Sequence, residues 1–271
     1  MTKRNFRRPR PVAEFQKEKA SKGQGQAGKG NEQAPEGPAL TSDLTANLAY
    51  LQGRIGPSND VIFRKFVLPF PTPVEAVLIF VDGLVSGTTI NEYILEALTT
   101  FDGKEADWAK DRRNLAEKIK DHVLIINEVS LESSLTLIIT AILSGETALL
   151  IDGDDRALIC NTRGWERRGI EEPATEAAVR GSRVGFNEVL RTNTAQVRRW
   201  IRDPDLRVKT MKIGVRSQTD VALVYLESVA NPDVVAEVEK RLKKIEIDGV
   251  VESAYLQEYI EDRPYSIFPT V

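Results

Sequence analysis

The chain has 271 residues, of which 41% are hydrophobic and 28% are charged, and its formal net charge is −3. One cysteine and one histidine exclude an internal disulfide bond and leave no histidine–cysteine cluster for a zinc site. The acidic balance argues against a whole-surface nucleic-acid binder, and the apolar stretches are shorter than the roughly 20 residues of a membrane-spanning helix, so we expect a soluble chain.

Residues 1–39 are rich in Arg, Lys, Gln, Gly and Pro. Such a segment cannot bury enough apolar surface to offset the entropy of ordering, so we expect a disordered basic tail. Its first cationic cluster, over residues 3–10, has the charge to contact anionic lipid or nucleic acid, although solvated disorder is the simpler interpretation.

After the tail, Asp43 is expected to cap a helix through Leu44, Leu48 and Leu51. The hydrophobic pattern then predicts elements in this order: a strand over Val61–Leu68, a buried strand over Ala76–Val81, an amphipathic helix over Ile90–Leu98, a polar helix over Trp108–Ile119, a strand over Val123–Ile126 and an apolar helix over Leu131–Leu143. Two further strands, Ala148–Ile151 and Ala157–Cys160, read as a hairpin with an acidic turn.

The second half repeats part of this order. Strands are expected over Val208–Val215 and Val221–Leu226, and Asn231, Pro232 and Asp233 have the residue types that open a helix. Strand, strand and helix therefore occur twice, about 147 residues apart, which favours two units. We predict an α/β protein with two small α/β subdomains and mixed sheets, residues 40–170 and 171–271, after the tail at 1–39.

Arginines concentrate between Arg163 and Arg202, where nine arginines and no lysine occur. Arginine is a planar, permanently charged fork that makes two-point contacts with carboxylates, carbonyls or phosphates. Wound as a helix, this segment has one apolar stripe, formed by Phe186, Val189, Leu190, Asn193, Val197 and Ile201. A second stripe holds Arg191, Arg198 and Arg202, and we expect it to be exposed while the apolar stripe faces the core.

Two interpretations of the arginines stay open at this point. They form surface ion pairs with nearby glutamates, each of little energetic value, or they form a face that docks a partner or binds an anion. The candidate residues for partner or ligand binding are Arg180, Arg183, Arg191, Asn193, Arg198 and Arg202.

No pattern in the chain indicates catalysis. The glycine-containing segment Val81–Ile90 lies between a strand and a helix but lacks the lysine and spacing of a phosphate-binding loop, so we read it as a structural turn. Asp152–Arg156 places an arginine where a calcium loop needs an oxygen ligand, and His122 has no nucleophile near it in sequence. We expect no enzyme activity, no cofactor and no metal.

Several segments resemble the N-terminal hydrophilic domain of the GerA family, the A-subunits of bacterial spore germinant receptors. They occur in the family's order and cover nearly everything after residue 40. These segments are 81–85 with 90–94, 143–153, 162–166 with 171–173, 180–194, 201–204, 216–225 and 247–249.

This resemblance implies two α/β subdomains at the N-terminus of a subunit that continues into membrane helices. It further implies a place in the spore inner membrane, with this domain facing the spore core, assembly with B and C subunits, self-association of A-subunits, and a part in nutrient sensing and signal transmission. The alternative is a domain that itself binds an amino acid or sugar in the cleft between the subdomains. Nucleic acid is not an expected partner.

Overall fold

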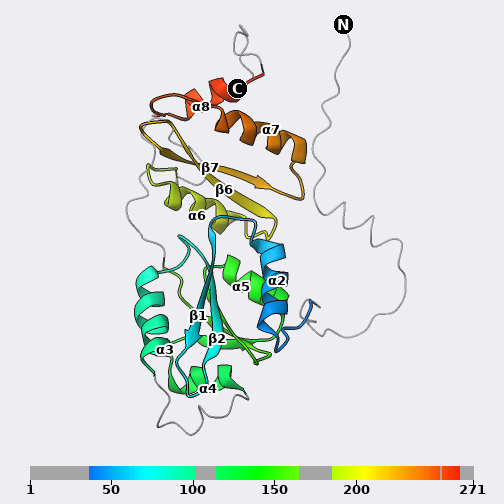
Figure 1. Ribbon diagram of the computed structural model, residues 1–271, viewed down its shortest axis with the longest axis vertical. Coiled ribbons are helices and arrows are strands. Elements are labelled where there is room, and N and C mark those ends of the chain that lie inside the picture. Colours follow the sequence, from blue (N-terminus) through cyan, green and yellow to red (C-terminus); the bar gives the residue numbers. More distant parts are fainter. Residues whose placement is uncertain (1–36, 102–113, 165–184, 251, 263–271) are drawn as a thin grey trace, which may run out of the picture. The chain divides into compact units, whose positions relative to one another are not determined.

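The computed structural model describes residues 37–101, 114–164, 185–250 and 252–262 (Figure 1). Of the predicted tail, only residues 37–39 are described, and there Ala39 forms an isolated β-bridge with Ser134. The predicted subdomain boundary at residue 170 also lies outside the described residues, so the division into 40–170 and 171–271 stays a prediction. No helix within the described ranges is long and apolar enough to cross a bilayer.

A five-stranded antiparallel sheet organises the first part of the chain, with strand order β1-β2-β4-β5-β3. Its strands are β1 Val61–Leu68, β2 Val74–Val81, β3 Val129–Glu132, β4 Thr147–Ile151 and β5 Ala157–Cys160. β4 and β5 are buried at every position, which explains their uninterrupted apolar sequences.

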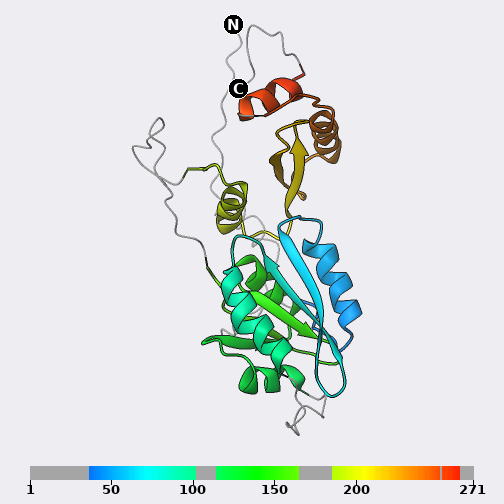
Figure 2. The same ribbon diagram turned by 60° about the vertical axis from the view of Figure 1, so that its left-hand side comes forward.

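Helices cover both faces of this sheet, as Figures 1 and 2 show. Helices α2 (Leu44–Ile55) and α5 (Leu135–Leu143) pack on one face, over one cluster of buried side chains. A π-helical segment, η1 (Thr89–Leu95), continues into α3 (Glu96–Thr100), and with α4 (Leu115–His122) it covers the second cluster. The result is an α/β/α arrangement with two cores.

The second part of the chain holds a two-stranded antiparallel ribbon, β6 (Leu206–Ile213) and β7 (Thr219–Leu226). It lies between α6 (Leu190–Trp200) and α7 (Pro232–Lys243), and α8 (Ser253–Ile260) packs next to α7 (Figures 1 and 2). Its small core cluster comprises Ile213, Leu242, Ile245 and Val250. The α/β class is confirmed, but every strand pairing in the described residues is antiparallel, not mixed.

The predicted capping residues begin two of the helices, α2 and α7. The Asp43 side chain accepts hydrogen bonds from Thr45 N and Ala46 N at 2.8 and 3.2 Å, which confirms the predicted start of α2. Asn231 likewise accepts from Asp233 N at 2.9 Å at the start of α7. Val234 in the first turn of α7 is 58% exposed, and the buried residue of this helix is Leu242 near its C-terminal end.

The predicted strand over Val123–Ile126 is wrong. This segment follows α4 without strand pairing, although Val123 is buried and Leu124 and Ile126 pack partly against the core. The strand is β3, which pairs with β5 from Val129↔Cys160 to Glu132↔Ala157. Because the Glu132 carboxylate then accepts from Ser133 N and Ser134 N, at 2.9 and 2.8 Å, the chain turns and α5 begins at Leu135, not at Leu131.

The predicted hairpin is confirmed, and its acidic turn has a structural task. Leu149 pairs with Leu158 across β4 and β5. Asp154, only 3% exposed, accepts hydrogen bonds from Ala116 N at 2.7 Å and from Arg156 N at 3.1 Å. One carboxylate of the turn therefore satisfies a backbone amide in the first turn of α4.

Replacement of Asp154 by Ala is expected to destabilise the protein by about 1.5–3 kcal/mol, because it removes hydrogen bonds to a buried charge and leaves the Ala116 amide unsatisfied. Urea unfolding measures the change. The control is Asp155→Ala in the same turn, which is exposed and is expected to change the free energy of unfolding by less than about 0.5 kcal/mol. Equal effects of the two substitutions would contradict the capping role.

Candidate functional site

The arginine-rich segment forms the predicted helix, α6, but with the opposite orientation. Its buried residues are Thr194, Ala195, Gln196 and Arg198. The members of the expected inward stripe that flank the helix are open to solvent, with exposed fractions of 72% for Phe186, 55% for Val189 and 37% for Ile201, and Trp200 is 69% exposed. Within the helix, Leu190, Asn193 and Val197 are half-buried. The prediction that the apolar stripe faces the core is therefore wrong.

Close approach to the glycine-containing loop explains this orientation. Gly83, with φ of +83°, lies so near α6 that a Cβ atom there would come within 3.0 Å of the Ala195 Cβ and 3.2 Å of the Arg191 carbonyl oxygen. A small side chain on α6 and a glycine in the loop are therefore both needed. Ala195 joins the core cluster under α2 and α5 at this contact.

Arg198 is the most constrained arginine of the site. Its side chain is 1% exposed, and its Nε donates to Asp60 Oδ2 at 2.7 Å. Its Nη2 contacts three acceptors, Asp60 Oδ1 at 3.0 Å, Ser58 Oγ at 2.8 Å and the Leu206 carbonyl at 2.9 Å. The expected exposed position of Arg198 is wrong, because a carboxylate from a loop far away in sequence neutralises it inside the protein.

The loop that holds this arginine also joins the two sheets. Ser58 Oγ donates to Asp60 Oδ1 at 2.6 Å and accepts from Val208 N at 2.8 Å. Asn59 N donates to the Val208 carbonyl at 2.8 Å. The guanidinium of Arg198 thus connects the loop before β1, helix α6 and the start of β6.

Arg198→Met is expected to destabilise the protein by about 3–5 kcal/mol, because Asp60 would stay buried without its cation. Adding Asp60→Asn should recover part of the loss, because the uncompensated charge is then removed. Urea unfolding of both variants measures this. Arg202→Met, at an exposed position just after the same helix, serves as the control, and a loss as large as that of Arg198→Met would refute the special role of Arg198.

Arg191 and Arg199 line a cavity of about 620 Å³ on the outer side of this junction. Arg191 is more than half exposed and forms an ion pair with Asp82 in the glycine-containing loop. Burial lowers the pKa of Arg199. The remaining lining residues are Gly83, Val85, Ser86, Gly87, Thr88, Gly164, Val189 and Thr192. The hydroxyl groups of Ser86, Thr88 and Thr192 and the guanidinium groups of the two arginines thus line one cavity. These hydrogen-bond donors are of the kind that binds an anionic group.

The loop beside the cavity is tightly packed. Ser86 Oγ accepts from Thr89 N at 3.2 Å, and Ser86 N donates to the Thr162 carbonyl at 2.8 Å. A Cβ atom on Gly164 would come within 2.4 Å of the Ser86 Cβ. The expected structural turn is present, but it also forms one wall of the cavity.

The six candidate residues differ in their environments. Asn193 is used internally, because its side chain accepts from Asn187 N at 2.8 Å and donates to the Asn187 carbonyl at 2.6 Å. Arg191 and Arg202 are exposed, Arg198 is buried, and Arg180 and Arg183 lie outside the described residues. The sequence reasoning missed Arg199, whose helical spacing from Thr192 places it on the cavity side.

The acidic, histidine and cysteine side chains of the described ranges include no group of three that is arranged to hold a metal ion.

Comparison with known proteins identifies the family. Residues 49–271 match the family described as Bacillus/Clostridium GerA spore germination protein. The chain belongs to this family. It is 36% identical over 241 residues to spore germination protein KA of Bacillus subtilis (strain 168), covering 89% of this chain and 43% of that protein. It is 33% identical over 230 residues to spore germination protein GerLA of Bacillus cereus, with coverages of 85% and 45%.

A crystal structure of this fold also exists. The N-terminal domain of the A subunit of the Bacillus megaterium spore germinant receptor GerK3 matches with a TM-score of 0.63 and 30% identity, over 86% of this chain and 84% of that one. The predicted relationship to germinant receptor A subunits is therefore confirmed. The chain spans less than half the length of the curated relatives that it matches.

Proposed function

We propose that this GerA-family chain acts as the N-terminal interaction domain of a spore germinant receptor A subunit, and that it passes the nutrient-dependent state of the receptor between subunits. Its expected partners are the B and C subunits and other copies of the A subunit, and membrane attachment would come from a part of the subunit outside this chain. The place of action is the spore inner membrane, with this domain on the core side. The proposal assigns no reaction and no cofactor.

The exposed side chains on and beside α6 support this proposal. Large apolar side chains are exposed along and beside the helix, at Phe186, Val189 and Trp200, and Arg191 lies among the polar groups at its N-terminal end. Aromatic residues and arginine are the side chains that contribute most to protein interfaces.

The energetics of the helix support the same conclusion. The exposed Arg191–Asp82 ion pair contributes about 0–1 kcal/mol to folding, so Arg191 is not needed for stability. Arg198 already anchors the helix from the other side. The exposed residues of α6 are therefore free to serve binding while the fold depends on the buried ones.

Arg191→Glu combined with Trp200→Ala is expected to leave the melting temperature of this chain nearly unchanged, because both side chains are mostly exposed. Spores that carry the same substitutions in the full-length subunit should germinate slowly or lose the receptor from the membrane, because an interface residue of this kind contributes about 2 kcal/mol or more. Circular dichroism, membrane immunoblots and germination rates measure the outcome.

The matched control is Lys244→Glu combined with Val234→Ala, an equally exposed charge and apolar side chain at α7. Normal germination of the control with impaired germination of the α6 variant supports an interface on α6. Normal germination of both would refute it.

The cavity beside α6 favours a second function, binding of a small molecule between the two predicted subdomains. Its lining includes residues from both sides of the predicted boundary and two arginines, which suit a ligand with a carboxylate. A nutrient at 100 times its dissociation constant should stabilise the chain by about 2.7 kcal/mol. Thermal shift with amino acids and sugars tests this, and Arg191→Met should abolish the shift if the ligand lies in this cavity.

A further inference from the structure

Strand β7 has the sequence of an inner strand but the exposure of an edge strand. Its residues from Val221 to Leu226 are all hydrophobic, which is typical of a strand buried within a sheet. Strands β4 and β5 of the first sheet are buried at every position, whereas all eight residues of β7 are described and none is buried. Because α6 and α7 lie on either side of the ribbon (Figures 1 and 2), an open edge accounts for this exposure.

The pairing of the ribbon directs three residues of β7 outward. In an antiparallel pair, alternate residues hydrogen-bond across the pair, and the others point their N–H and C=O groups away from it. Val208 of β6 is of the second kind, because its N–H and its C=O both bind the loop before β1, at 2.8 Å each. Its partner in register is Val224, so Asp220, Ala222 and Val224 present their backbone groups on the outer edge of β7.

This outer edge has no partner within the described ranges. No other strand there pairs with β7, and the backbone hydrogen bonds outside the sheets do not reach its three outward residues. The outer edge of β6 is different, because Ser58 and Asn59 bind Val208, and the Asn59 side chain also accepts from Thr210 N at 3.3 Å. The ribbon thus has one covered edge and one open edge.

Strand β7 also lacks the proline, lysine or β-bulge that usually protects an edge strand from pairing. It contains no proline and no lysine, and its eight pairs with β6 run without interruption from Leu206↔Leu226 to Ile213↔Thr219. Its one charged residue, Asp220, is near the start of the strand and forms an ion pair with Lys212 of β6 at 3.5 Å. The edge is therefore suited to pairing with a further strand.

We propose that the outer edge of β7 receives an additional strand, which comes from the part of the same subunit that follows this chain. This inference rests on the proposed function, in which this chain is the N-terminal domain of a longer subunit, but it concerns the ribbon and not the α6 surface. The three outward residues offer three N–H and three C=O groups to an extended segment. On one face of the ribbon, Val221 packs against the cluster of Ile213 and Leu242, so the residues of the added strand beside it should be apolar.

The course of the chain after α7 favours this source for the strand. Arg241 of α7 donates to the Ile260 carbonyl at 2.6 Å and forms an ion pair with Asp262 at 2.7 Å, so the end of α8 is held against α7. Helix α7 is itself joined to β6 by the ion pair between Lys209 and Glu239. Nine residues of this chain follow Asp262, so a longer subunit continues from a point near the ribbon.

A strand from this continuation has an entropic advantage over a second copy of the chain. In the curated relatives, more than half of the protein lies outside the matched region, which leaves ample chain for such a strand. A tethered strand is present at a high effective concentration, whereas a second copy loses translational freedom when it binds. A ribbon of two strands also gains stability when a third strand joins it.

Amide hydrogen exchange of β7, measured in this chain and in the full-length subunit with fragmentation to single residues, tests the proposal. In this chain, the amides of Asp220, Ala222 and Val224 should exchange freely, while those of Val221 and Leu223 are protected by β6. In the full-length subunit, the three outward amides should exchange at least about tenfold more slowly. Equal exchange in the two proteins would overturn the proposal.

Two other sources of a strand give different results in the same experiment. Protection that rises with the concentration of this chain would assign the edge to a second copy. Protection in a dilute solution of this chain would assign it to the chain's own residues. Either result would overturn the proposal, whereas neither depends on germination, so the α6 interface is judged separately.

A pair of proline variants separates the outer edge from the inner one. Ala222→Pro removes an outward N–H, and proline is accepted in an edge strand at such a position, so the melting temperature of this chain should stay nearly unchanged. In the full-length subunit, Ala222→Pro should return the exchange of Asp220 and Val224 to the rates of the isolated chain. Exchange as slow as that of the unsubstituted subunit would contradict the proposal.

The control is Leu223→Pro, which removes an N–H that pairs with Lys209 across the ribbon. It should abolish the protection of β7 in both proteins, because proline cannot donate to the ladder between β6 and β7. The comparison of the two unsubstituted proteins needs no variant, so the proposal stays testable if Ala222→Pro does not fold.

Discussion

The buried guanidinium of Arg198 holds together the parts of the chain that define the α6 surface. Desolvation of a full positive charge is costly, and it is tolerated here because Asp60 neutralises the charge while Ser58 and the Leu206 carbonyl accept further hydrogen bonds. These acceptors come from the loop before β1 and from the start of β6. The same side chain therefore determines where α6 sits and how the ribbon β6–β7 leaves the first sheet.

The orientation of α6 follows from this anchor. Arg198 and Ala195 face the protein interior, and the apolar stripe lies on a different side of the helix. The apolar stripe therefore cannot face the core as well. Trp200 at the end of the helix is consequently exposed, and Arg191 forms an ion pair with Asp82 of the glycine-containing loop. The buried residues of α6 thus stabilise the fold, and its exposed residues are the ones proposed to bind a partner. Substitutions can therefore test the two roles separately.

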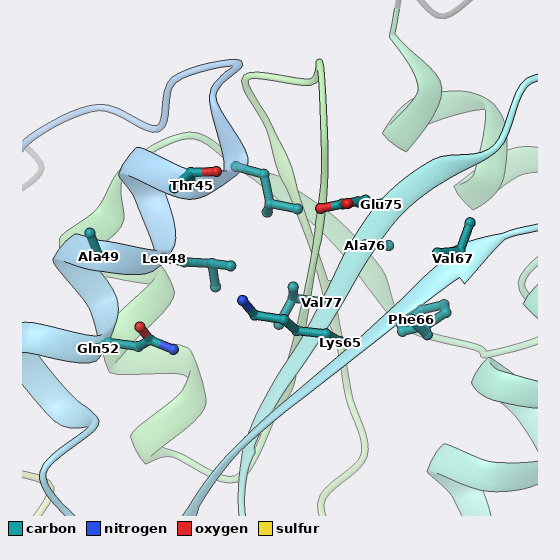
Figure 3. A pocket seen from close by; sticks show the side chains of 11 residues that line it. Thr45, Leu48, Ala49, Gln52, Lys65, Phe66, Val67, Glu75, Ala76 and Val77 are labelled. Carbon is teal, nitrogen blue, oxygen red and sulfur yellow. The ribbon is translucent and has the colours of Figure 1, made fainter.

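A second cavity, of about 480 Å³, lies beside α2 and is built differently from the cavity beside α6 (Figure 3). The cavity beside α6 depends on the junction, because the glycine-containing loop and the helix form its walls together. The cavity beside α2 depends only on the first sheet, where the helix and the ends of two strands leave an opening with Lys65 and Glu75 at its wall.

The amino-acid sequence by itself determined the features that depend on neighbouring residues. The bounds of β1, the caps at Asp43 and Asn231 and the hairpin of β4 and β5 follow from alternation, capping chemistry and turn residues, all of which act within a few positions. The family relationship was visible for the same reason, since its segments are contiguous motifs. The position of β3 was not visible, because Val123–Ile126 is the more apolar of the two segments and only pairing with β5 selects Val129–Glu132, in which Ser130 and Glu132 alternate with apolar residues.

Tertiary structure alone decided the candidate site. Periodicity identified two stripes on α6 correctly, but it assumed that the apolar stripe would be buried, since an unpaired arginine is expensive to bury. Asp60 neutralises Arg198 and so removes most of the cost of burying it. Asp60 lies 138 positions earlier in the chain, and the two residues are brought together only in the folded protein. The cavity beside α2 likewise depends on the register of β1 with β2 and on the placement of α2, which no local pattern specifies.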